Sequence, residues 1–119
     1  MTAGGWTVWV VIFDDEFDVE FERHPPDLQD QILAKAGLLA RFGPQLGRPH
    51  ADHLKGSAYP NMKELRLKFE GQVWRIAYAF DPARNAIVLA AGDKQGQDER
   101  RFYKELISLA DRRFAKYRP

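Results

Sequence analysis

The chain has 119 residues, of which 45% are hydrophobic, 13% aromatic and 29% charged, and its formal net charge is +1. This composition excludes a disordered chain, and the length suits one domain, so we expect a single domain over residues 1–119. The absence of cysteine excludes a disulfide framework, thiolate metal sites and cysteine nucleophiles. The longest apolar run, Trp6 to Phe13, is too short to span a membrane and no export signal is apparent, so we expect a cytoplasmic protein.

The first half of the chain predicts one strand, two helices and a long loop. Residues 7–13 are β-branched and aromatic, which is typical of a strand. Residues 14–23 have acids in the first turn and two phenylalanines four residues apart, which predicts a short helix ended by Pro25 and Pro26. Residues 26–42 carry an apolar stripe at helical spacing that stops at Gly43-Pro44, and we expect residues 43–62 to be largely loop.

Two alternating apolar sets predict a β-hairpin in residues 65–69 and 74–80, with a two-residue turn at Glu70-Gly71. This turn sets Arg66 opposite Arg75, because a slip of one residue would move the apolar side chains away from the core. Residues 86–91 are apolar on both faces and predict a third, central strand. We expect this strand to pair with residues 74–80 and to place Gly92 opposite Arg75, Leu89 opposite Tyr78 and Ile87 opposite Phe80.

The last segment, from Gln97 onward, predicts a long amphipathic helix with a basic end that suits the helix dipole. The whole predicts an α+β fold. A small antiparallel sheet, built from the N-terminal strand and a three-stranded meander, packs against two N-terminal helices and a C-terminal helix. Helices on one face of such a sheet would leave the other face free for function.

Several cations should converge on that free face. The register sets Arg66 against Arg75, Lys68 lies two residues from Arg66, and Lys94 has the parity of Gly92, where a missing side chain would let another backbone approach closely. Like charges directly opposite each other are destabilising, which favours a phosphate or a run of phosphates as the ligand. The alternative interpretation is that nearby acids such as Glu64 neutralise ordinary surface cations.

Other parts of the sequence give weaker indications of chemistry. His50 and His53, with Asp52 between them, could hold a metal in principle, but no third ligand follows at a metal spacing, and we predict no metal and no cofactor. The sequence contains no glycine-rich phosphate loop.

Ordered motifs in the second half resemble the HigB-like, phage-derived branch of the RelE/ParE superfamily of bacterial toxins. The similarity runs from about Phe17 to Tyr117, and its most specific pieces follow one another in a fixed order. They are His53-Leu54-Lys55-Gly56, Met62-Lys63-Glu64-Leu65-Arg66, Trp74-Arg75-Ile76-Ala77-Tyr78, Ala91-Gly92-Asp93-Lys94, and a closing helix with Phe102-Tyr103 and Leu109-Ala110-Asp111-Arg112.

The resemblance implies an endoribonuclease that cuts mRNA on the ribosome and is neutralised by a cognate antitoxin, commonly a helix-turn-helix (HigA-like) protein. It implies catalytic roles for Arg66, Arg75 and Lys94, and it matches Lys55 to the lysine of the family's Leu-Lys-Gly piece. We expect Lys55 and Lys68 to contact RNA. The family's lysine pair after the last strand is present here only as Lys94 followed by Gln95.

The expected reaction is attack by the RNA's own 2′-hydroxyl on the neighbouring phosphate, which requires no metal if side chains stabilise charge and move protons. The forked arginines suit the developing charge. The base is left open between Lys94 and Lys68, with Tyr59 or His53 as possible assistants.

Two other functions fit the same family likeness. A ParE-like toxin would inhibit gyrase and would not need convergent cations. A catalytically inactive module would only bind the antitoxin. Whichever function applies, an antitoxin could dock on the basic sheet face or on the acidic stretch 14–30, which holds eight acids and one base.

Overall fold

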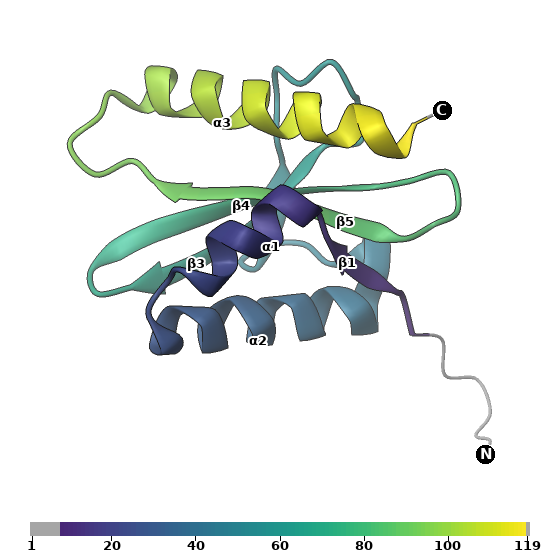
Figure 1. Cartoon of the computed structure of the whole chain (residues 1–119), viewed down its shortest axis with the longest axis horizontal. Coiled ribbons are helices and arrows are strands. Elements are labelled where there is room, and N and C mark those ends of the chain that lie inside the picture. Colours follow the sequence, from purple (N-terminus) through teal and green to yellow (C-terminus); the bar gives the residue numbers. More distant parts are fainter. Residues whose placement is uncertain (1–7, 119) are drawn as a thin grey trace.

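A computed structural model of the protein describes residues 8–118. Within these residues, five strands form one mixed sheet in the order β1-β5-β4-β3-β2, and three α-helices cover its two faces (Figure 1). In chain order the elements are β1 (Val11–Phe13), α1 (Asp15–Glu22), α2 (Pro26–Phe42), the 3-10 turn η1 (Gly43–Gln45), β2 (Ala51–His53), β3 (Lys63–Phe69), β4 (Gln72–Phe80), β5 (Ala86–Asp93), α3 (Glu99–Phe114) and the 3-10 turn η2 (Ala115–Tyr117). None of the helices among them is long and apolar enough to cross a membrane.

The predicted α+β fold is confirmed, and local signals account for most of its element boundaries. Asp14 caps α1, because its carboxylate accepts hydrogen bonds from the backbone N–H groups of Glu16 and Phe17 at 3.0 and 3.2 Å. Pro26 occupies the first turn of α2, where its missing N–H costs nothing. The predicted strand 7–13 is shorter than expected: Thr7 lies outside the described residues and β1 begins at Val11.

The hairpin between β3 and β4 has the predicted register, with Arg66 opposite Arg75. Both turn residues, Glu70 and Gly71, have positive φ, as a two-residue hairpin turn requires. The predicted pairing of β4 with β5 is right from Trp74 to Ala77 and wrong beyond it. A bulge there shifts Tyr78 onto Val88 and Phe80 onto Ala86, so Leu89 has no cross-strand partner.

The edges of the sheet differ from the prediction. β1 pairs with β5 in parallel, which makes the sheet mixed and not antiparallel. β2 adds a fifth strand within residues 43–62, where we expected loop, and pairs with β3. Local sequence patterns predict neither feature. β2 is only three residues long, and the pairing of β1 with β5 depends on how the chain crosses between them.

The sheet is covered on both faces, so the expectation of one free face is wrong. α1 and α2 pack on one face around Phe17, Leu39 and Ile76, and α3 packs on the other around Leu89 and Phe114 (Figure 1). The apolar stripe of α3 needs a second apolar surface. β4 and β5 supply it because their middle residues are buried on both sides.

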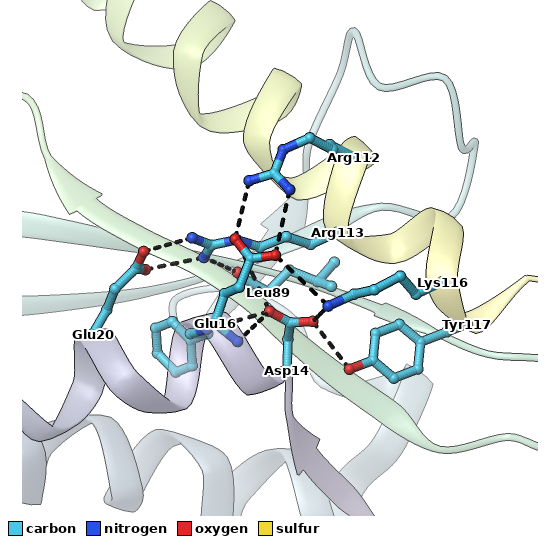
Figure 2. A network of polar contacts seen from close by, with 9 residues as sticks. Asp14, Glu16, Glu20, Leu89, Arg112, Arg113, Lys116 and Tyr117 are labelled. Carbon is cyan, nitrogen blue, oxygen red and sulfur yellow. Dashed lines mark hydrogen bonds and ion pairs between the residues drawn. The ribbon is translucent and has the colours of Figure 1, made fainter.

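Charges of opposite sign join the start of α1 to the end of α3 (Figure 2). Asp14 is fully buried and lies 2.8 Å from Lys116 Nζ, while Arg113 donates to Glu20 at 3.0 Å and to the carbonyl of Leu89 at 2.8 Å. That carbonyl belongs to the bulge residue. Part of the acidic stretch that we considered as a docking surface is therefore engaged within the fold.

Candidate functional site

Arg75 lies beneath the first turns of α3 and is 5% exposed. Its Nε donates to the hydroxyl of Tyr103 at 2.9 Å, and Nη1 donates to the carbonyl of Val73 at 3.1 Å. Its guanidinium carbon is 5.6 Å from the centre of the Phe102 ring and 5.5 Å from that of Tyr103. The aromatic rings and hydrogen bonds hold the guanidinium in one orientation.

A buried carboxylate is linked to this arginine through Tyr103. The tyrosine hydroxyl donates to Glu64 Oε1 at 2.9 Å and accepts from Arg75, so it bridges the two. Burial raises the pKa of Glu64, and the hydrogen bond from Tyr103 and the charges of Arg66 and Arg75 only partly offset that effect. Burial and the Glu64 carboxylate raise the pKa of Tyr103. Such a carboxylate and hydroxyl can hold or pass a proton.

A second carboxylate lies between two of the predicted catalytic cations. Glu99 Oε1 is 3.9 Å from Arg75 Nη2 and 3.7 Å from Lys94 Nζ. The expected approach of another backbone at Gly92 is wrong, because a Cβ there would lie 3.2 Å from the Phe102 ring, which already fills that space.

The structure therefore changes the predicted picture of crowded, unpartnered cations. Arg66 and Arg75 are opposite each other as expected. Arg75 and Lys94, however, have acidic neighbours, because α3 covers this face and brings Glu99 with it. Their mutual repulsion is offset by the protein's own carboxylates. This is the alternative that the sequence left open.

A cationic groove of about 440 Å³ runs along the edge of β3 beyond the short strand β2. It contains Arg66 and Lys68 from the predicted set. Other basic residues line it that we did not predict: Lys35 from α2, and Arg48 and His50 from the loop before β2. Lys35 Nζ lies 2.9 Å from His50 Nδ1, and burial lowers the pKa of Lys35. The one sequence feature that hinted at this groove is the excess of bases in residues 41–78, which hold seven bases and three acids. α2 and the loop meet only through tertiary packing.

Of the remaining predicted residues, Lys55 lies next to Tyr103 of the first group, whereas Tyr59 and His53 lie apart from both groups. Lys55 lines a different groove, together with Tyr103 and Lys104 of α3. Tyr59 packs edge-on against Phe114, with 5.0 Å between ring centroids, and His53 lines a third groove with Trp9. No cluster of three or more metal-ligating side chains occurs within residues 8–118.

A family model and two relatives match most of the chain. The family model "Phage derived protein Gp49-like (DUF891)" matches residues 19–115. Two Mycobacterium tuberculosis proteins are similar over 87 residues. "Putative toxin HigB2" is 46% identical, with 72% of this chain and 43% of that protein covered. "Putative toxin HigB3" is 45% identical, with 73% and 74% covered. The chain thus matches less than half the length of HigB2.

A solved structure shares the fold. A double arginine-to-alanine mutant of the Escherichia coli toxin RelE in the free state superposes with a TM-score of 0.54, covering 85% of this chain and 95% of that one. Sequence identity is 14%, so this likeness concerns the fold alone.

Proposed function

The chain belongs to the Gp49-like family and is related to the HigB3 toxin, and on that premise we propose that it is the toxin of a toxin–antitoxin pair and cleaves messenger RNA on the ribosome. The observation that supports cleavage most is the pairing of Arg66 with Arg75 across β3 and β4, beside the hydrogen-bonded carboxylate of Glu64 and hydroxyl of Tyr103. The cationic groove next to Arg66 suits the backbone of a single RNA strand.

The proposed reaction is transesterification by the RNA itself. The 2′-oxygen forms a bond to phosphorus as its proton leaves, and the bond from phosphorus to the 5′-oxygen breaks as that oxygen takes a proton from water. The products are a 2′,3′-cyclic phosphate and a free 5′-hydroxyl. Arg66 and Arg75 would stabilise the charge that develops on the phosphoryl oxygens. Glu64, through Tyr103, is the acceptor that the geometry supports best, because burial raises the pKa of this carboxyl toward the range of a working base.

Lys94 is proposed to contact the same phosphate as Arg75, and Lys55 and Lys68 to contact RNA on either side. The proposed partners are a ribosome carrying mRNA and a cognate helix-turn-helix antitoxin. The single toxin domain over residues 1–119 is part of the same proposal.

The test compares single variants with a matched control. Arg66→Ala, Lys94→Ala and Arg75→Lys should each reduce ribosome-dependent mRNA cleavage at least tenfold and relieve growth arrest on induced expression. The lysine is chosen at Arg75 because truncation would leave Glu64 and Tyr103 buried without a cationic partner. Arg101→Ala, an exposed change on α3, should retain full activity. Folded variants that cleave like the wild type would refute the proposed site.

One observation favours a second candidate, a catalytically inactive module that only binds an antitoxin. Arg75 is buried and already has Tyr103 and Glu99 as neighbours, an arrangement that a purely structural arginine would share. This module would not arrest growth when expressed alone. DNA damage without mRNA cleavage would instead indicate a gyrase inhibitor of the ParE kind.

A further inference from the structure

The first turn of α3 places an acidic side chain where the proposed function needs an anion. Glu99 Oε1 is the nearest carboxylate oxygen to both Arg75 Nη2 and Lys94 Nζ, at 3.9 and 3.7 Å. Within the described residues, the hydrogen bonds of the Arg75 guanidinium use Nε and Nη1, which leaves Nη2 directed toward Glu99. A single negatively charged group thus lies between two cations that come from β4 and from the loop after β5.

We infer that the carboxylate of Glu99 occupies the binding position of one RNA phosphodiester, and that the RNA must displace it to reach Arg75 and Lys94. This inference rests on the proposed function for the identity of the ligand. A phosphodiester carries the same charge as a carboxylate and offers two acceptor oxygens, so it can replace Glu99 between the two cations.

The Glu99 carboxylate is held weakly enough for another anion to displace it. Both distances exceed the range of a hydrogen bond, and the Glu99 side chain is 60% exposed while that of Lys94 is 44% exposed. The Lys94–Glu99 pair is exposed on both sides and contributes little to stability, whereas in the Arg75–Glu99 pair only Glu99 is exposed. At the other end of the same helix, by contrast, Arg113 is 3% exposed and donates hydrogen bonds to Glu20 and to the carbonyl of Leu89, so its guanidinium is held in place.

The chain supplies a matched control for a charge-removal experiment. Glu105 is also on α3, has a similar exposure of 56%, and pairs with Arg101 and not with the proposed site. Glu99→Gln and Glu105→Gln change the net charge equally, so any general electrostatic effect on RNA binding is common to both. Glu99→Ala repeats the test without an amide that could still accept a hydrogen bond from Arg75.

The measurement is the affinity of the whole chain for a short 2′-O-methyl RNA oligonucleotide, which lacks the attacking hydroxyl, followed by fluorescence anisotropy. Glu99→Gln and Glu99→Ala should tighten binding about fivefold relative to the wild type, and Glu105→Gln less than about twofold. The slope of log K against log salt should steepen by about 0.7 in the Glu99 variants, because counterions replace the carboxylate and are released by the RNA. In a Lys94→Met background the gain from Glu99→Gln should shrink.

The outcomes separate this inference from the proposed function. Equal affinities of the Glu99→Gln and Glu105→Gln variants, or no binding by any form, would overturn the inference. Tighter binding by the Glu99 variants supports it, even if no form cleaves mRNA on ribosomes, in which case the proposed function fails alone. Cleavage by the wild type together with unchanged affinity of the Glu99 variants would overturn the inference and leave the proposed function standing.

Discussion

Replacing Asp14 tests whether the ionic network of Figure 2 holds α3 in place. Asp14 is fully buried and combines two tasks. It caps α1 through the N–H groups of Glu16 and Phe17, and it receives Lys116 Nζ at 2.8 Å and the hydroxyl of Tyr117 at 3.0 Å. Its removal affects two helices that are far apart in the sequence.

The magnitude follows from these contacts. Loss of an N-cap costs about 1 kcal/mol. Breaking a buried ion pair costs about 3–5 kcal/mol, but the cations here are less affected because Arg113 retains Glu20 and Lys116 is half-exposed. We therefore expect Asp14→Ala to lower the free energy of unfolding by about 3 kcal/mol. Asp14→Asn, which keeps an oxygen for the cap, should cost about 1–2 kcal/mol.

Urea unfolding followed by far-UV circular dichroism measures both values, with Asp18→Asn as the control, because Asp18 is exposed on the same helix. Burial alone would raise the pKa of Asp14, but hydrogen bonds from Lys116, Phe17 N–H and Tyr117 outweigh it and hold the pKa below its ordinary value of 3.8. The ionised form is therefore the stabilising one. The gap between wild type and Asp14→Asn should be complete above pH 3.8 and close as pH falls through the lowered pKa. Equal costs for Asp14→Asn and Asp18→Asn at neutral pH would refute the reasoning.

Three further changes probe the site and the hairpin. Because burial raises the pKa of Glu64, folding favours its neutral form more than the unfolded chain does. The stability of the wild type relative to Glu64→Gln should thus be highest below pH 4.5 and decline as pH rises through the raised pKa, as measured by urea midpoints at a series of pH values. Tyr103→Phe removes the hydroxyl between Arg75 and Glu64 and should lower the free energy of unfolding by about 2 kcal/mol, together with mRNA cleavage; unchanged cleavage would exclude the proposed proton path. Gly71→Ala should cost about 1–2 kcal/mol in thermal unfolding from its φ of 77° alone, since nothing lies within 4 Å of the added methyl group.

Local patterns predicted the elements well where one face of each element is buried. The alternation in residues 65–80 specified the β3–β4 register because a slip of one residue would expose Leu65 and Leu67, which are both buried. The bulge at Leu89 could not be predicted in this way. Residues 86–90 are buried on both sides, so a shift by one residue moves no apolar side chain into water.

The opposition of two arginines in the candidate site was predictable from the sequence, and the groups that surround them were not. The strand register brought Arg66 and Arg75 together, as the sequence required. The acids that lie near these cations depend on the position of α3. The sequence pattern predicts that one side of α3 is apolar, but it does not predict which face of the sheet that side covers. Glu99, Tyr103 and Lys35 therefore joined the two groups only once the chain was folded.

The two ends of α3 are held by different kinds of contact, and this difference bears on the proposed site. The C-terminal end is joined to α1 by Asp14 and Arg113, both buried, whereas the first turn meets Arg75 and Lys94 through an exposed carboxylate beyond hydrogen-bond distance. Phe102 and Tyr103 also hold the first turns of α3 against Arg75, so the site can open by movement of the Glu99 side chain alone, without disturbing the core. Substitution at Asp14 should consequently change stability, while Glu99→Gln should change RNA affinity and leave the urea midpoint within the scatter of surface substitutions. A marked loss of stability in Glu99→Gln would show that the Glu99 carboxylate is a fixed part of the fold.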